Sequence, residues 1–77
     1  MIEQAFYLSD DSNLDLAEEL TGLAIDEIEV IVGRFTKTSH RSGSLRGELI
    51  VYVDGSTAIR HHFNKKILWS SDGGIND

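Results

Sequence analysis

With 77 residues and no cysteine, this chain has room for one small core that neither disulfides nor metal thiolates can reinforce. It has no apolar run near the ~20 residues of a membrane span and no basic leader, so we expect a cytoplasmic protein without membrane contact. The 40% of hydrophobic residues and the absence of proline argue against disorder, and the net charge of −6 opposes nucleic-acid binding by the chain as a whole.

The first expected elements are an edge strand over residues 2–8 and a helix over residues 13–21. Ser12 suits the N-cap of this helix, and Asp15 follows as a capping-box-like acid. Gly22 is placed to end the helix, because glycine readily adopts the left-handed conformation of a helix C-terminus. The apolar residues that recur at helical spacing, with Ala17 beside them, predict the buried face of this helix: Leu16, Leu20 and Leu23.

Residues 25–38 fit two different structures. The spacing of a helical stripe is met by Ile28, Ile31, Val32 and Phe35. That stripe would give a second helix at 25–35. Ile28, Val30 and Val32 also alternate, as the residues of a half-buried strand do. The β-branched content favours the strand, and the helix remains the alternative.

A hairpin is expected in the second half of the chain. A loop over 39–44 leads into a strand over 45–53, whose apolar residues on both faces indicate a central position in the sheet. Asp54-Gly55 predicts a type I′ turn between this strand and the next. Such a turn sets the register of the hairpin, with these expected pairs: Val53 with Ser56, Val51 with Ala58, Ile50 with Ile59, and Glu48 with His61.

The return strand is expected from an alternation of apolar and aromatic residues: Ile59, His61 and Phe63. A turn at 64–66 then leads into a further strand at 67–69, and a helix over 57–69 is the competing prediction. The small polar residues over 71–77 predict a frayed tail.

The fold class expected for the single domain 1–77 is therefore α+β. One helix (about 13–21) packs on an antiparallel meander of roughly three to four strands, with the second helix at 25–35 as an alternative.

The charges are divided along the chain. Residues 1–33 hold nine acids and no Lys or Arg, whereas residues 34–66 hold all seven Lys and Arg against two acids. The acidic segment could face the basic one within the fold, face it in a second copy as a homodimer, or serve a different partner. The first arrangement is the simplest.

One short motif matches the start of a calcium-binding loop, at Asp11-x-Asn13-x-Asp15. The rest of that loop is missing, because Leu16 and Gly22 stand where glycine and a bidentate glutamate are needed. We therefore interpret these residues as the solvated start of a helix.

His61-His62 is the other candidate for a metal site. On a strand the two rings point to opposite faces, and His40 lies far away in sequence, so no shared ion is expected. The chain has no nucleophile elbow, phosphate loop or dinucleotide motif. We expect no cofactor, no metal and no enzymatic activity; catalysis would need a site formed between two copies.

Residues 16–28 resemble the helix-turn-helix segments of bacterial regulators, with Gly22 as the turn glycine. The resemblance implies a helix pair. It does not imply DNA reading, because Asp26, Glu27 and Glu29 would stand on the recognition helix and repel phosphates. In composition the chain also resembles small phage-encoded inhibitors, which are short, acidic and free of cysteine.

The function that we expect is that of a small protein-binding regulator or inhibitor, with a basic partner surface such as that of host nucleic-acid machinery. The acidic helical face that would meet this partner consists of Asp15, Glu18, Glu19, Asp26 and Glu29. Aromatic anchors near the termini would add affinity: Phe6, Tyr7 and Trp69.

The alternative function is nucleic-acid binding by the basic segment. The residues that would contact phosphates are Arg34, Lys37, Arg41, Arg46, Arg60, Lys65 and Lys66. Exposed rings could stack on bases, and the candidates are Phe35, Tyr52 and Phe63.

Overall fold

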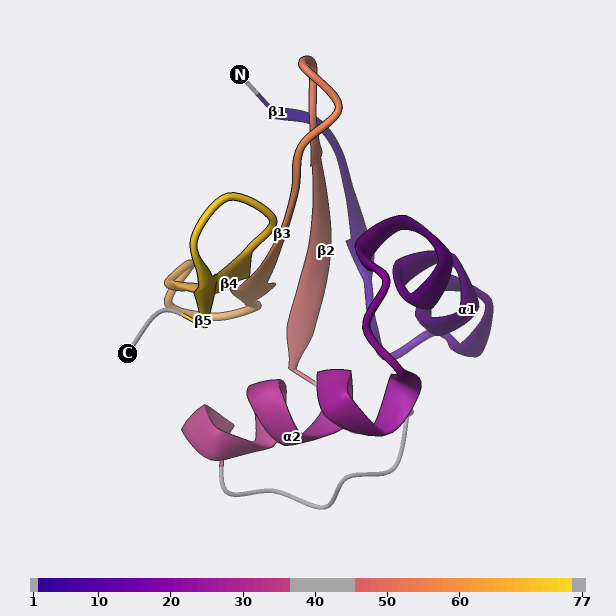
Figure 1. Cartoon of the computed structure of the whole chain (residues 1–77). Helices are drawn as coiled ribbons and strands as arrows, with labels where there is room; N and C mark the ends of the chain where they lie inside the picture. Colours follow the sequence, from indigo (N-terminus) through magenta and orange to yellow (C-terminus); the bar gives the residue numbers. More distant parts are fainter. Residues whose placement is uncertain (1, 37–45, 76–77) are drawn as a thin grey trace.

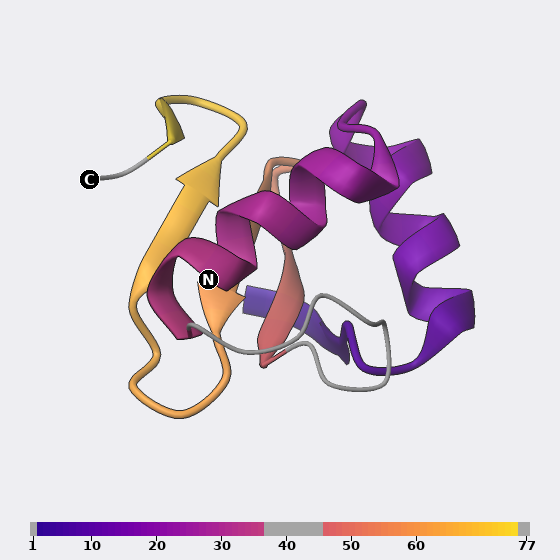
Figure 2. The same cartoon turned by 90° about the horizontal axis from the view of Figure 1, so that it is seen from below.

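The computed structural model describes residues 2–36 and 46–75, as two helices and a five-stranded antiparallel sheet of order β1-β2-β3-β4-β5 (Figure 1). The elements in chain order are β1 (Ile2–Tyr7), α1 (Asp11–Thr21), α2 (Ile25–Thr36), β2 (Gly47–Tyr52), β3 (Thr57–His61), β4 (Ile67–Ser70) and β5 (Gly74–Ile75). Figure 2 shows α2 crossing the sheet with α1 beside it on the same side. The expected fold class is confirmed, as is the edge position of β1.

Helix α2 replaces the strand that we favoured over residues 25–38, and that prediction is wrong. Ile28, Ile31 and Val32 are buried together, whereas Val30 is 58% exposed. Alternating burial would have placed Ile28, Val30 and Val32 on one face, so the 3.6-residue period prevails over the β-branched content. The remainder of the predicted strand, residues 37–38, and the predicted loop over 39–44 lie outside the described residues.

Helix α1 begins two residues before its predicted start, with Asp10 rather than Ser12 as the N-cap. The Asp10 carboxylate accepts hydrogen bonds from the Ser12 backbone N–H at 3.0 Å and from the Ser12 hydroxyl at 2.7 Å. Gly22 ends the helix as predicted, with φ of +78°. Its N–H donates to the Glu18 carbonyl at 3.0 Å.

The buried face of α1 also differs from the prediction. Leu14 and Ala17 are the buried residues of this helix, Leu16 and Leu23 are partly buried against the core, and Leu20 is exposed. Leu14, which the predicted stripe did not include, therefore belongs to the buried face, and Leu20 lies outside it.

The β2–β3 hairpin forms where Asp54-Gly55 predicted it, but with a different register. Gly55 N–H donates to the Tyr52 carbonyl at 3.0 Å and Tyr52 N–H donates to the Ser56 carbonyl at 2.9 Å, so three residues form the loop. Gly55 takes the left-handed conformation, with φ of +90°, at the last loop position. The predicted two-residue loop is therefore wrong.

The longer loop moves every pair of the hairpin by one residue. The observed pairs are Gly47 with His61, Glu48 with Arg60, Leu49 with Ile59, Ile50 with Ala58 and Val51 with Thr57. The expected pair of Glu48 with His61 is not formed. Glu48 faces an arginine instead, and this decides the chemistry of that face.

The sheet has two different faces. On the helix side, directly paired residues form an apolar row across all five strands: Phe6, Leu49, Ile59, Trp69 and Ile75. Three of these residues, Leu49, Ile59 and Trp69, belong to the buried core with residues of α1 and α2. The next row projects from the opposite face, because successive side chains alternate in a strand. This row consists of Tyr7, Glu48 and Arg60. A register shift between Ile59 and Arg60 sets Ile67 of β4 opposite Arg60.

Strands β3 and β4 form in place of the alternative helix over 57–69, and the chain does not fray directly after β4. Within the stretch expected to be a frayed tail, Gly74 and Ile75 form β5 and pair with Ser70 and Trp69. This short strand extends the apolar row by one residue at the far edge of the sheet.

Candidate functional site

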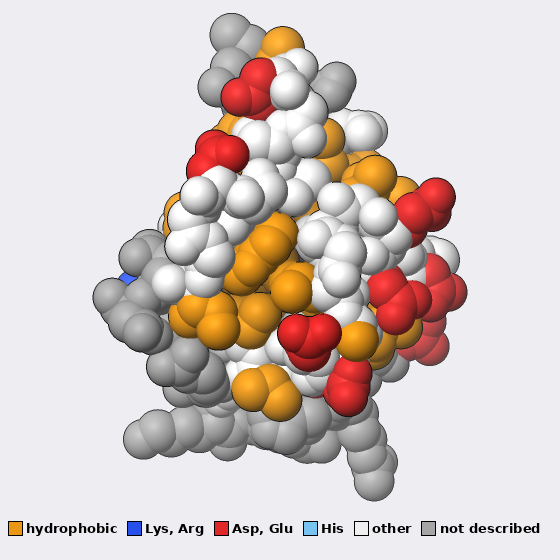
Figure 3. Space-filling model, in the orientation of Figure 1, with side chains coloured by type: hydrophobic (Ala, Val, Ile, Leu, Met, Phe, Trp, Pro, Cys, Tyr) orange, Lys and Arg blue, Asp and Glu red, His pale blue; other side chains and the backbone are white. Residues whose placement is uncertain are grey.

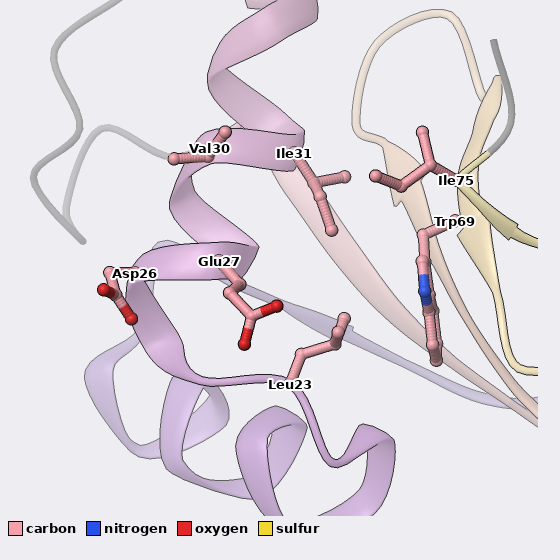
Figure 4. Close-up of a pocket in the computed structure, with 7 residues that line it drawn as sticks. All are labelled: Leu23, Asp26, Glu27, Val30, Ile31, Trp69 and Ile75. Carbon is pink, nitrogen blue, oxygen red and sulfur yellow. The ribbon is translucent and has the colours of Figure 1, made fainter.

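An apolar groove lies between helix α2 and strands β4 and β5. It has a volume of about 330 Å³ and is lined by Leu23, Asp26, Glu27, Val30, Ile31, Trp69 and Ile75; we call it the α2–β5 groove. Figure 4 shows Leu23 and Ile31 on the helix side, facing Trp69 and Ile75 on the strand side. In the space-filling view, hydrophobic side chains gather in this hollow (Figure 3).

The groove exists because two apolar surfaces meet incompletely. Trp69 and Ile31 are almost completely buried and form its base. The side chain of Val30 is more than half exposed, and that of Ile75 is half exposed. Ile75 is brought there by its pairing with Trp69 in the β4–β5 ladder. Exposed apolar residues that adjoin a buried aromatic ring are typical of a surface that receives a partner.

Two carboxylates stand on the helix side of the groove. Asp26 and Glu27 occupy the first turn of α2, where negative charge is favourable beside the positive end of the helix dipole. The Glu27 carboxylate also accepts a hydrogen bond from the Ala24 backbone N–H at 3.2 Å, as one half of a capping box. Both acids are exposed. The groove therefore combines an apolar base with a negatively charged rim.

The structure divides the predicted acidic face between two helices. Asp15, Glu18 and Glu19 are exposed on α1, where their spacing places them on one side of the helix. Asp26 lines the groove, and Glu29 lies on α2 partly buried. Figure 3 shows acidic side chains over the side of the molecule formed by α1.

Sequence reasoning did not select five of the residues that line the groove as binding residues: Leu23, Glu27, Val30, Ile31 and Ile75. Of the predicted aromatic anchors, Trp69 lines the groove, Phe6 packs against the core and Tyr7 lies on the opposite face. The helical spacing of Ile28 and Ile31 was a usable signal for α2, whereas the position of Ile75 depends on a strand that was not expected.

The opposite face of the sheet carries a buried carboxylate, Glu48, which is 2% exposed. Arg60 Nε donates a hydrogen bond to its Oε1 at 2.8 Å, and Arg60 Nη2 forms an ion pair with the same oxygen at 2.8 Å. His62 Nδ1 and Lys65 Nζ lie 3.3 Å from its Oε2. Burial alone would raise the pKa of Glu48, but the hydrogen bonds from Arg60, His62 and Lys65 lower it below its ordinary value.

The predicted basic residues are only partly brought together. Arg60 and Lys65 converge on Glu48, and Arg46 and Lys66 are also on described parts of the chain. Arg34 lies in α2, whereas the predicted contacts at Lys37 and Arg41 lie outside the described residues.

His61 and His62 have different environments. The His61 ring is buried, and its Nδ1 accepts hydrogen bonds from the backbone N–H groups of Phe63 at 3.1 Å and Asn64 at 3.3 Å. His62 lies beside Glu48. Within residues 2–36 and 46–75, no group of three His, Asp or Glu side chains is arranged to hold a metal ion.

The helix pair that resembles a helix-turn-helix segment is present as α1 and α2, joined by residues 22–24. Over the described part of the chain, neither helix has the length and hydrophobicity of a membrane span. Comparisons with protein-family models, with curated proteins and with solved structures find no match for this chain.

Proposed function

We propose that this protein is a small non-enzymatic regulator that holds a basic, amphipathic segment of another protein in the α2–β5 groove. The observation that carries the proposal is the combination of Trp69, Val30 and Ile75 as an apolar surface with Asp26 and Glu27 beside it. Amphipathic helices are commonly received by such grooves, with their apolar side inward. Lysine or arginine on the flank of the bound segment would then meet the two carboxylates.

The energy available from the groove is moderate and local. Val30 and Ile75 are about half exposed, so covering them would contribute roughly 1 kcal/mol each. The acids of α1, namely Asp15, Glu18 and Glu19, would act at longer range by attracting the basic partner before contact. We therefore expect the groove to set the affinity and α1 to raise the association rate. An inhibitor of a protein with a basic nucleic-acid channel is the specific form of this proposal.

The sole tryptophan of the chain, Trp69, is a built-in probe for the groove. The ligand for the test is a synthetic helical peptide of about 18 residues with leucine on one side and lysine on the other. Titration of this peptide should shift the Trp69 emission with a saturable curve. A peptide with glutamate in place of lysine should bind at least about tenfold more weakly at low salt.

Two valines provide a matched pair of variants. Val30 in the groove is 58% exposed and Val53 in the distant hairpin is 62% exposed. Val30→Ser should weaken peptide binding by about fivefold, because it removes apolar surface from the groove. Val53→Ser should leave binding unchanged. Equal behaviour of the two variants would remove the groove from the proposal.

The two acidic surfaces can be separated in the same assay. Asp26→Asn with Glu27→Gln should weaken binding at equilibrium, and the glutamine can still accept the hydrogen bond from Ala24 N–H. Glu18→Gln with Glu19→Gln should slow association at low salt and change dissociation little. If the α1 pair changes dissociation more than the groove pair does, α1 rather than the groove is the contact surface.

A further inference from the structure

The strongest feature outside the α2–β5 groove is a row of rings on the opposite face of the sheet. The Tyr7 and His62 rings meet edge to face with centroids 4.8 Å apart, and the His62 and Phe63 rings do so at the same distance. The Arg46 guanidinium lies over Phe63, 5.7 Å from the ring centroid. We call these four residues the aromatic row.

Two rings of the aromatic row remain largely exposed to solvent even though they pack against a neighbouring ring. Tyr7 is 56% exposed and Phe63 is 66% exposed, although each ring contacts His62. Two large rings that are more than half exposed and both packed against His62 present π-surface to solvent. Single-stranded nucleic acids use such rings, because every base has a face that can stack.

The row is held in place by groups that are themselves buried or bonded. His62 N–H donates to the Arg46 carbonyl at 2.6 Å, and Phe63 N–H donates to the buried His61 ring at 3.1 Å. The His62 ring is oriented by Glu48, whose carboxylate lies beneath it in the same row as Tyr7. The protein would therefore lose little conformational entropy when a ligand binds to these rings.

Positive charge surrounds the same rings. Arg46 is exposed above Phe63, and Lys65 is about half exposed while it pairs with Glu48. Arg60 supports this pair from the neighbouring strand. A hollow of about 180 Å³ beside the row is lined by Tyr7, Ser9, Arg46, Gly47 and His62. The guanidinium and hydroxyl there are suitable donors to phosphate oxygens.

We infer that the aromatic row is a binding site for single-stranded nucleic acid, in which bases stack on Tyr7 and Phe63 and phosphates meet Arg46 and Lys65. The site lies on the opposite face of the sheet from the α2–β5 groove, so the inference is independent of what the groove holds. The acids of α1 and α2 lie on the other side of the sheet, which explains how a chain of net charge −6 can carry such a site.

The test is fluorescence anisotropy of the full chain with a labelled oligo(dT) of about 12 nucleotides, an oligo(U) of the same length and a duplex. The single strands should bind at low salt and the duplex more weakly, because its bases are already stacked. Two or three phosphate contacts predict a slope of roughly −1.5 to −2 in the plot of log K against log salt.

Substitutions of Phe63 separate stacking from charge. Phe63→Ala and Phe63→Leu should each weaken binding at least about fivefold, whereas Phe63→Trp should preserve or strengthen it. Val53→Ser, at the other end of the sheet, is the control and should bind like the wild type. Phe63 is exposed, so these variants should keep the wild-type circular dichroism spectrum.

Three results would overturn the inference. One is wild-type affinity of Phe63→Ala, and a second is equal affinity for duplex and single strand. The third is displacement of oligo(dT) by poly-glutamate added at the same concentration of negative charges. That result would mean that the basic residues bind acidic protein segments without any role for the rings. Failure of the groove peptide to bind would affect none of these measurements.

Discussion

Gly47 of β2 lies close beneath Val32 of helix α2, and the distances there allow a prediction of the effect of a substitution. A Cβ atom at this position would lie 2.8 Å from Val32 Cγ2 and 3.2 Å from Leu8 Cδ1. Both neighbours are fully buried, so neither can move into solvent. Gly47→Ala should therefore destabilise the fold by overpacking.

Overpacking of a core costs about 1–3 kcal/mol, and the smaller unfolded-state entropy of alanine returns about 0.4–1 kcal/mol. The expected net loss for Gly47→Ala is about 1–2 kcal/mol in the free energy of unfolding. For a domain of this size, each kcal/mol corresponds to a fall in Tm of roughly 4–8 °C. Urea denaturation followed by Trp69 emission measures the loss directly.

A second variant identifies the clash as the cause. Val32→Ala removes both Cγ atoms and should itself cost about 2 kcal/mol through the cavity that it leaves. In that background Gly47→Ala should cost almost nothing, because its Cβ enters the vacated space. The coupling should exceed about 0.5 kcal/mol, the ordinary error of additivity. The prediction is refuted if Gly47→Ala is as stable as the wild type, or if its cost is unchanged in the Val32→Ala background.

Two further predictions concern Glu48 and Gly22. The folded-state pKa of Glu48 lies below its ordinary 4.5, so its stabilisation is present above that pH and is lost as pH falls through the lowered value. Glu48→Gln should lower the free energy of unfolding at pH 7 by about 1–3 kcal/mol. The free energy of unfolding of this variant should also fall less steeply than that of the wild type as the pH is lowered; an equally steep fall would contradict the prediction. Gly22→Ala should cost about 1 kcal/mol, because φ is +78° while no atom lies within 4 Å of the new Cβ. A melting temperature of Gly22→Ala equal to that of the wild type would show that the left-handed conformation carries no cost.

Where local signals in the sequence agreed with one another, they predicted the structure well. Gly22 ends α1, Asp54-Gly55 forms the hairpin, and residues 67–69 lie within a strand. At Gly22 and Gly55 the backbone preference of glycine located the end of a helix and a turn, and the short apolar run at 67–69 located a strand. The α+β class followed from these elements.

The errors arose where two local signals competed. Val30 and its neighbours favoured a strand by composition and a helix by spacing, and the burial of a whole helical stripe against the sheet decided the outcome. At the hairpin, glycine at the second turn position suited both a two-residue and a three-residue loop. The difference of one residue determined whether Glu48 would meet His61 or Arg60.

The groove and the aromatic row lay beyond the reach of sequence reasoning for a different reason. Ile75 is 44 residues after Ile31 in the numbering, and only the packing of α2 on the sheet and the pairing of β5 with β4 bring the two together. Tyr7 precedes His62 by 55 residues, and the two rings meet because β2, which follows both helices in the chain, pairs with β1.

One wall of the α2–β5 groove is made by a strand of only two residues. Such a short strand opens with a much smaller free energy than the centre of the sheet. Opening of β5 carries Ile75 away from Trp69, so the groove is complete only in those molecules in which β5 is docked. If the groove holds a ligand as proposed, its binding is linked to the docking of β5: the ligand would protect β5 from proteolysis, and a truncation before Ile75 would remove part of the groove lining.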